Sequence, residues 1–269
     1  MSPHNKSAPV TDIAQDRIRY AKAFGACAPI YERARSGYPA SLISDIEHFA
    51  GENGIKSVLE VGAGSGKATI PIAKMGVVLD CIEPSRRMSG ILRASCAGFP
   101  NVTISTTTFE RWRPRRRYCL LVASQSWHLV DPDVRLAKAA QVIRPGGTLA
   151  LFWNLPPQPA SDLAGRTLDS ILRDLGLNLT PASNPTPEPR TLPPLYSSPD
   201  FTDISVKTYR TMYRLSFSRY IDILHTYPEY NALGRSARQQ LSNRLTSTIF
   251  AHGSVDGCHY TSMHLARRT

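Results

Sequence analysis

Residues 58–69 read VLEVGAGSGKAT, and this stretch sets the fold prediction. An apolar run of strand length ends at Val61 and is followed by Gly62, Gly64 and Gly66, which alternate with small residues. Glycine at such a turn permits left-handed backbone conformations and lets the backbone come close to a ligand. The stretch therefore predicts a buried strand that ends in a turn almost free of side chains.

Short apolar runs and helical periods alternate along much of the chain. Apolar residues at successive positions indicate strands that are buried on both faces, as in a parallel sheet. Helical periodicity over 67–76, 85–98 and 131–143 lies between such runs. This alternation predicts right-handed crossovers in a doubly wound sheet. The seven predicted strands are 57–62, 77–83, 101–106, 118–123, 147–153, 201–215 and 257–268.

We expect one domain over residues 1–269, because 42% hydrophobic content and this length suffice for a single large core. Residues 1–50 predict a helical cap, and 51–155 predict the ligand-binding core. Residues 156–200 are dense in proline and predict a linker or insert. Residues 201–269 predict the last two strands with a helical insert between them.

The charged residues give a formal net charge of +11, from 32 basic and 21 acidic side chains. Such an excess permits contact with nucleic acids, anionic membranes or acidic small molecules, and it does not choose among them. The densest run, RWRPRRR (111–117), contains one tryptophan. We predict a solvated loop there and no specific nucleic-acid partner.

The five cysteines include no C-x-x-C pair, and Cys81 and Cys119 lie in apolar, strand-like runs. This usage predicts reduced thiols and a cytoplasmic protein. The N-terminus shows no apolar signal-peptide core, and no stretch has membrane-spanning length, so we expect no membrane partner. His225, His252 and His259 lack ligand spacing, and we expect no metal site.

Three classes of ligand compete for the glycine turn. A phosphate-binding P-loop requires G-x-x-x-x-G-K-[ST], whereas Ala68 follows Gly66 and Lys67 here. A nicotinamide dinucleotide fingerprint, G-x-G-x-x-G, needs its third glycine at position 67, which is lysine. Glu83 nevertheless stands at about the separation at which an acid holds a ribose diol in that fold, so the dinucleotide stays an alternative.

The third class depends on Glu60, two residues before the first glycine. A carboxylate at the carboxyl end of this strand faces the crevice in which open α/β sheets bind ligands. It would repel a pyrophosphate and attract a ligand that carries both an ammonium group and a sulfonium. Both charges belong to S-adenosylmethionine (SAM). On this interpretation the bare turn admits the methionine and ribose parts, and Glu83 accepts the ribose hydroxyls.

The ordered motifs resemble those of class I SAM-dependent methyltransferases, and the resemblance covers nearly the whole chain. It implies a Rossmann-like α/β fold with a seven-stranded, mostly parallel sheet, its last strand antiparallel, and an N-terminal helical cap. It also implies SAM as cofactor and S-adenosyl-L-homocysteine as product. The motifs that carry it are VLEVGAGSGKAT (58–69), VVLDCIEPSRRM (77–88), QVIRPGGTLALFWN (141–154), YERARSGYP (31–39), TTTFERW (106–112), SQSWHLVDP (124–132) and the C-terminal YIDILHTYP and HLARR.

The resemblance implies a set of cofactor contacts. The glycines would line the methionine and ribose, Glu83 would bind the ribose hydroxyls, and Phe109 would lie against the adenine. Thr108 stands where the family often has the aspartate that bonds the adenine amino group, so a hydroxyl replaces it. Tyr31 would place its hydroxyl near the SAM carboxylate. The implied set is Tyr31, Glu60, Gly62, Gly64, Gly66, Glu83, Pro84, Thr108, Phe109 and Ser124.

Methyl transfer from a sulfonium is an in-line displacement, in which the protein mainly positions the nucleophile and excludes water. A base helps when the nucleophile begins protonated. His128 follows the fourth strand and is the candidate base, with a structural histidine beside Trp127 as the alternative. Tyr20, Trp127 and Asn154 are candidate acceptor contacts, each with a purely structural role as its alternative.

The leading hypothesis is a SAM-dependent methyltransferase of a small-molecule acceptor, such as a natural product. Two alternatives stay open: a SAM-binding enzyme of this fold that catalyses cyclisation or another non-transfer reaction, and a nicotinamide-dependent oxidoreductase. We expect substrate choice to reside in the cap, the proline-rich segment and residues 211–256. An exchanged cap helix would allow a homodimer or a higher homo-oligomer.

Overall fold

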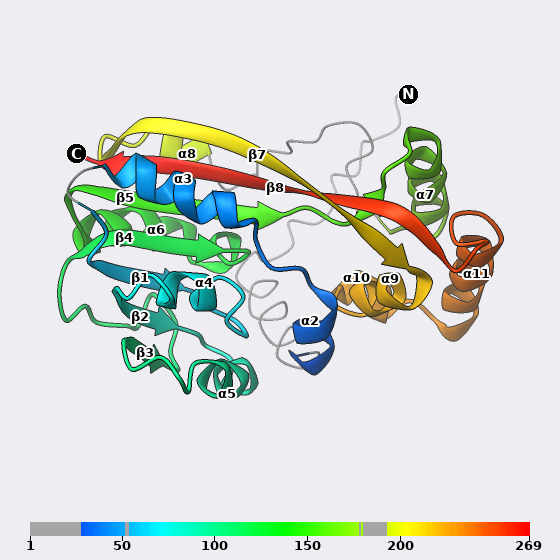
Figure 1. Cartoon of the computed structure of the whole chain (residues 1–269), viewed down its shortest axis with the longest axis horizontal. Coiled ribbons are helices and arrows are strands. Elements are labelled where there is room, and N and C mark those ends of the chain that lie inside the picture. The colour runs from blue at the N-terminus through cyan, green and yellow to red at the C-terminus, as the bar shows by residue number, and fades with distance from the viewer. Residues whose placement is uncertain (1–27, 52–53, 178, 180–192) are drawn as a thin grey trace, which may run out of the picture.

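The structure is a computed structural model that describes residues 28–51, 54–177, 179 and 193–269. The strands of the described ranges form one sheet (Figure 1). They are β1 (Ser57–Val61), β2 (Val78–Ile82), β3 (Val102–Ser105), β4 (Tyr118–Ser124), β5 (Ile143–Asn154), β6 (Gln158–Pro159), β7 (Phe201–Ser216) and β8 (Ser254–Arg268). The helices are α2 (Ala28–Ala34), α3 (Ala40–Ala50), α4 (Thr69–Ala73), α5 (Arg86–Ser95), the 3-10 helix η1 (Trp127–Leu129), α6 (Pro132–Val142), α7 (Asp162–Asp174), α8 (Pro193–Tyr196), α9 (Phe217–Leu224), α10 (Pro228–Ala232) and α11 (Arg235–Ser247).

The first five strands are parallel to one another, in the order β3-β2-β1-β4-β5. The last strand, β8, runs antiparallel to β5 along one edge and antiparallel to β7 along the other. The predicted α/β fold, a mostly parallel sheet whose last strand is antiparallel, is confirmed. The structure adds β6, a two-residue strand beside β8, which is too short to show a periodicity in the sequence.

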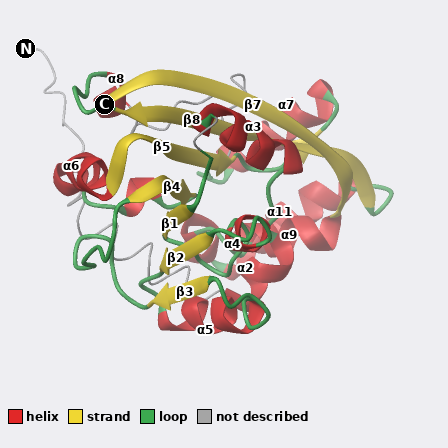
Figure 2. Cartoon of the chain, turned by 60° about the vertical axis from the view of Figure 1, so that its left-hand side comes forward, coloured by secondary structure: helices red, strands yellow, loops and turns green. Residues whose placement is uncertain are grey.

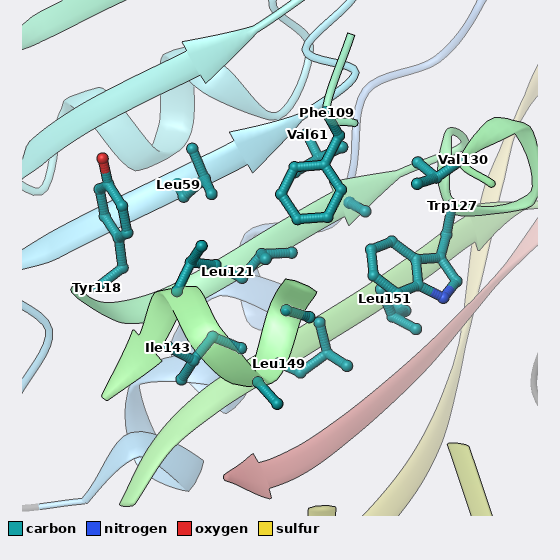
Figure 3. Packing of buried hydrophobic residues seen from close by; sticks show 14 of the residues in the cluster. Leu59, Val61, Phe109, Tyr118, Leu121, Trp127, Val130, Ile143, Leu149 and Leu151 are labelled. Carbon is teal, nitrogen blue, oxygen red and sulfur yellow. The ribbon is translucent and has the colours of Figure 1, made fainter. Parts of the chain in front are cut away.

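Alternate residues of the central strands bury two separate cores, one on each face of the sheet. Leu59, Leu121 and Leu149 are neighbours in register and pack on the face covered by α6, as Figure 3 shows. Val58 and Leu120 point to the opposite face, which α3, α4 and α5 cover. Figure 2 shows α6 on one side of the stacked strands and α3 and α4 on the other. Burial on both faces explains why these strands read as continuous apolar runs.

Two helices that cover the sheet, α5 and α6, begin with side-chain caps. Ser85 accepts a hydrogen bond from the Met88 amide and begins α5, and Asp131 accepts one from the Asp133 amide and begins α6. Pro132 occupies the first turn of α6, where its missing N–H costs no hydrogen bond. The helix predicted over 67–76 is shorter in the structure, because the glycine turn occupies its start and α4 begins only at Thr69.

A third cluster of buried residues lies beyond the sheet, where α7, α9, α10 and α11 gather (Figure 1). The interval predicted as a proline-rich linker or insert, 156–200, contains α7 and α8 as well as the extended stretch around β6. Leu168, Ile171 and Leu172 have the i, i+3, i+4 spacing of a helix face, and all three are buried. Residues 180–192, the most proline-rich part, lie outside the described residues.

The predicted helical cap is described only from Ala28 onward, as α2 and α3; Tyr20 and the rest of 1–27 lie outside the described residues. The predicted helical insert between the last two strands consists of α9, α10 and α11, and Pro228 begins α10. In the described part of the chain, no helix combines the length and apolar character needed to cross a bilayer.

Candidate functional site

A cavity opens at the carboxyl ends of β1, β4 and β5. It encloses about 600 Å³ including its open mouth. At one end it is lined by the glycine turn after β1, and at the other by residues of β7, β8 and α9. The loop between α2 and α3 completes its wall. The lining residues are Tyr31, Arg35, Ser36, Tyr38, Gly62, Ala63, Gly64, Ser65, Lys67, Ser124, Gln125, Asn154, Leu155, Pro157, Tyr213, Ile223 and His259.

The glycine turn depends on backbone conformations that other residues rarely adopt. Gly62, Gly64 and Gly66 have φ values of 72°, 59° and 103°. A β-carbon on Gly62 would lie 2.4 Å from Cβ of Ser126, so the chain of the β4 loop packs directly on this glycine. A β-carbon on Gly64 would meet nothing within 4 Å. The turn therefore packs against the protein at Gly62 and leaves open space at Gly64.

Glu83 follows β2 and holds the glycine turn in place. Its Oε2 accepts a hydrogen bond from the Gly64 amide at 2.8 Å, and its Oε1 accepts one from the Ser85 amide at 2.7 Å. Burial raises the pKa of this carboxyl group, and the two amide hydrogen bonds oppose that shift. The carboxylate is thus fixed beside the open position at Gly64, which is where the sequence analysis placed a group for ribose hydroxyls.

Glu60 differs from the expectation of a carboxylate that faces the crevice. Its side chain is fully buried, and it is not among the residues that line the cavity. Its Oε2 accepts a hydrogen bond from Thr69 Oγ1 at 2.7 Å, whereas Oε1 is buried with no partner in the described part of the chain. Burial raises the pKa of Glu60 to about 7. Strand alternation explains the difference, because even-numbered residues of β1 point to the face that α4 covers.

Residues 58–147 match the family model described as "Methyltransferase domain". Residues 58–147 thus carry a methyltransferase domain. An uncharacterized methyltransferase of Mycobacterium tuberculosis (strain ATCC 25618 / H37Rv) is 33% identical over 132 residues, which are 49% of this chain and 52% of that protein. The demethylmenaquinone methyltransferase of Tropheryma whipplei (strain Twist) is 32% identical over 97 residues, 36% of this chain and 41% of that protein.

The chain thus spans about half the length of the curated relatives it matches. Among solved structures, a candidate type II methyltransferase from Anaeromyxobacter dehalogenans has a TM-score of 0.63 at 18% identity, covering 87% of this chain and 97% of that chain. A phosphoethanolamine N-methyltransferase 2 of Haemonchus contortus, solved with phosphomonomethylethanolamine and S-adenosylhomocysteine, has a TM-score of 0.51 at 12% identity, covering 99% and 62%. These likenesses extend the shared fold beyond residues 58–147.

His128 lies in η1 of the methyltransferase domain, near the cavity but not among its lining residues. Its Nδ1 accepts a hydrogen bond from the Trp153 indole N–H at 3.4 Å, so the neutral ring carries its proton on Nε2. The residue is exposed; the protein packed around it, and then the charge of Arg135, lower its pKa to about 4. A group this weakly basic, with its free nitrogen already protonated, is a poor general base.

Two aromatic residues that the sequence analysis placed against ligands pack in the core of the domain. Phe109 is 2% exposed, and its ring centroid lies 6.4 Å from that of Trp127, which is fully buried (Figure 3). Neither is among the residues that line the cavity. The same is true of Thr108, whose hydroxyl accepts a hydrogen bond from the Arg111 amide, and of Pro84.

Asn154, Tyr31 and Ser124 do line the cavity, as the sequence analysis expected of ligand contacts. The Asn154 side chain, however, is used within the protein. Its amide donates to the carbonyl oxygens of Ser36 and Gly37, at 3.3 and 3.0 Å, and its Oδ1 accepts from Thr261 Oγ1 at 2.6 Å. These contacts hold the loop after α2 on the sheet, which favours the structural role of Asn154.

The lining residues that were not predicted as site residues include Arg35, Tyr38, Tyr213 and His259. Arg35 donates from Nε to Thr226 Oγ1 at 2.8 Å, and its guanidinium lies 4.2 Å from the centroid of the Tyr227 ring. Only the motif YERARSGYP (31–39) could have pointed to Arg35 and Tyr38. Tyr213 and His259 meet through the pairing of β7 with β8, for which the sequence gives no register. Within the described ranges, no cluster of three or more metal-ligating side chains is present.

Proposed function

We propose that this protein is a SAM-dependent methyltransferase that acts on a small-molecule acceptor. One observation carries the proposal: three glycines with left-handed backbone line or support one end of a cavity, and the Glu83 carboxylate is held at the amide of the middle one. The methyltransferase domain over residues 58–147 supports it. The relatives named above are methyltransferases whose acceptors differ or are unknown, so the acceptor class rests on this chain alone.

The residues present at the glycine end fit SAM. Open space beside Gly64 admits the ligand, and the Glu83 carboxylate there can accept hydrogen bonds from a ribose diol. Ser65 lines the cavity, and its buried Oγ has no partner in the described part of the chain. The unpartnered Oε1 of Glu60 is buried beside the turn, and this carboxyl group supplies negative potential for a cationic ligand where it is ionised, above its pKa of about 7. Tyr31 lines the same cavity from α2.

When bound, SAM supplies a methyl group that is already activated by its sulfonium. The protein then has to hold the acceptor in line, exclude water and receive a proton where the acceptor has one to lose. His128 does not suit that last role, because its hydrogen bond from Trp153 leaves only a protonated nitrogen. We therefore expect His128→Gln to retain turnover within a few-fold of the parent, and a loss of turnover at unchanged SAM affinity would contradict this assignment.

Two other functions are the alternatives that an experiment should separate. A nicotinamide-dependent oxidoreductase would use the same glycine turn and Glu83, but position 67 is a lysine where the fingerprint needs glycine. A SAM-binding enzyme that catalyses cyclisation or another non-transfer reaction would share the whole cofactor end. No contact in the described part of the cavity favours either of them over methyl transfer.

Calorimetric titration of the full chain with SAM, S-adenosyl-L-homocysteine and NADH tests the cofactor. We expect binding of the first two and none of NADH; the reverse would replace the proposal with the oxidoreductase. Mass spectrometry of the purified protein for a retained S-adenosyl ligand gives an independent reading. Methyl-labelled SAM then tests the reaction, since label that never reaches a product in the presence of turnover would favour a non-transfer reaction.

The setting of this activity is also proposed from the sequence. We place a small-molecule, natural-product type acceptor in the cavity, no specific nucleic acid and no membrane as partner, and the protein in the cytoplasm. The four described cysteines, Cys81, Cys96, Cys119 and Cys258, are free and buried, which agrees with reduced thiols. A homodimer or a higher homo-oligomer would be detected by light scattering.

A further inference from the structure

The end of the cavity at β8 contains a polar group that the proposed function does not use. His259 is 4% exposed and lines the cavity, and neither of its ring nitrogens has a hydrogen-bond partner in the described part of the chain. A buried polar atom left without a partner destabilises the folded protein, and nearly all such atoms in folded proteins are satisfied. The imidazole is thus placed to meet a polar group that enters the cavity.

A second donor without a partner in the described ranges belongs to Arg219, which lies over Tyr213 of the cavity wall and is not itself a lining residue. Arg219, in α9, places its guanidinium 5.0 Å from the centroid of the Tyr213 ring, and the His259 ring centroid lies 5.5 Å from that centroid. Arg219 Nη2 donates to Ser36 Oγ at 3.1 Å, whereas its Nε is buried without a partner in the described ranges. Burial, and then the charge of Arg219, lower the pKa of His259, so the ring is neutral at pH 7 and offers one N–H.

The charges around the cavity favour an anion. Arg35 and Lys67 are among its lining residues, and no lining residue of the described chain is Asp or Glu. Lys67 is partly neutralised by Glu32, whose Oε1 lies 3.3 Å from its Nζ. Arg35 donates to the hydroxyl of Thr226, and its guanidinium lies 5.7 and 4.2 Å from the ring centroids of Tyr31 and Tyr227. The Glu83 carboxylate lies behind the glycine end, so a wall with cations and no acid favours an anion at the opposite end.

We propose that the acceptor end of the cavity binds an anionic small molecule of the carboxylate class, whose oxygens accept hydrogen bonds from His259 and from Nε of Arg219. The assignment of this molecule as the methyl acceptor rests on the proposed function. In the sheet, β4 and β5 separate β8 from β1. At about 4.8 Å per strand, the two ends of the cavity are roughly 14 Å apart, which leaves room for a cofactor at the glycine turn.

A pair of matched probes tests this site: benzoate, and benzamide as its uncharged counterpart. Both are titrated into the full chain saturated with S-adenosyl-L-homocysteine, so that the carboxylate of the cofactor is already in place. We expect benzoate to bind about tenfold more tightly than benzamide, because charge-assisted hydrogen bonds are about twice as strong as neutral ones. Benzoate should also shift the imidazole resonances of His259 in nitrogen-15 spectra.

Two variants distinguish the hydrogen bonding of the His259 nitrogens from the volume of its ring. His259→Phe keeps a ring in place and should abolish the preference for benzoate, whereas His259→Gln restores a side-chain N–H and should recover part of it. Arg219→Gln should weaken the binding of benzoate and leave the affinity for benzamide unchanged. His48→Phe replaces an exposed histidine of α3 and serves as the matched control, with no expected change.

The result also distinguishes this inference from the proposed function. S-Adenosyl-L-homocysteine binding that is retained in His259→Phe, together with a lost benzoate preference, supports both. A parent protein that binds no S-adenosyl ligand contradicts the proposed function, and benzoate titrated into the ligand-free chain then decides the anion site by itself. Equal affinities for the two probes, an unshifted His259, or an undiminished preference in both His259→Phe and Arg219→Gln would overturn the inference.

Discussion

At the scale of single residues, the glycine turn separates a packing requirement from a ligand requirement. Gly62 has no room for a side chain, since its β-carbon would lie 2.4 Å from Ser126, and Gly64 has ample room. Both have positive φ, which costs other residues about 1–2 kcal/mol. Gly62 and Gly64 therefore look alike in the sequence, but packing requires the first, and the second leaves space for a ligand.

Substitution by alanine should reveal this difference. We expect Gly62→Ala to destabilise the protein by several kcal/mol, because backbone strain and the clash with Cβ of Ser126 add. Gly64→Ala should cost only about 1–2 kcal/mol and should weaken SAM binding, because its methyl group projects into the open space at the cavity. Gly90→Ala, in α5 with nothing within 4 Å, is the control and should be neutral or slightly stabilising. Urea unfolding and calorimetry measure both effects, and equal destabilisation at positions 62 and 64 would refute the packing argument.

Glu60 should make the stability of the ligand-free protein depend on pH. Burial raises its pKa from 4.5 to about 7, so between these values the folded chain keeps a proton that the unfolded chain releases. The free energy of unfolding must then fall as the pH rises through this window, and it stays low above pH 7. Glu60→Gln lacks this titration and should be more stable than the parent at pH 8, by about 3 kcal/mol at most.

The comparison of unfolding curves at several pH values isolates Glu60, because Glu83 titrates with a raised pKa in both proteins. SAM should also bind less tightly to Glu60→Gln, since the negative potential beneath the turn is removed. Parallel curves of stability against pH for the parent and Glu60→Gln would show that the pKa of Glu60 is the same in the folded and unfolded chains. An unchanged SAM affinity would remove the electrostatic reason for preferring SAM to a dinucleotide.

At the scale of elements, α6 anchors the loop that precedes β4. Lys138 is 9% exposed, and its ammonium group donates to the carbonyl oxygens of Phe109, Glu110 and Trp112, at 2.5, 3.0 and 2.6 Å. Lys138→Met would leave these oxygens without their donor and should cost about 3 kcal/mol of stability. Lys74→Met, at an exposed position after α4, should change stability by less than about 0.5 kcal/mol. Similar urea midpoints for the two variants would contradict this anchoring role.

The strands could be predicted from the sequence because burial on both faces leaves continuous apolar runs. The helix α7 could not, because its buried leucines lie in a proline-rich interval that favours an extended chain. The direction of the Glu60 side chain was missed for a different reason. The position of the strand was predicted, but the face of the sheet that α4 covers depends on tertiary packing. Tyr213 and His259 meet only through the register of β7 and β8, and no local pattern encodes that pairing.

At the scale of the whole molecule, the net charge of +11 should give weak, non-specific affinity for RNA. The arginines of the run 111–117 are exposed, as expected of a solvated loop, although Trp112 is buried against Tyr118. Contact with about four phosphates of a single strand would make the affinity fall roughly 50-fold between 50 and 200 mM salt. Unrelated sequences of equal length should bind alike.

Fluorescence anisotropy with two labelled RNA oligomers of different sequence measures this behaviour. Replacing Arg113, Arg115 and Arg117 by serine should flatten the salt dependence, because fewer counterions are released on binding. It should leave SAM binding unchanged, since none of the three is among the residues that line the cavity. RNA binding that persists at 300 mM salt and discriminates between the oligomers would instead identify a nucleic-acid substrate, and would displace the small-molecule acceptor from the proposed function.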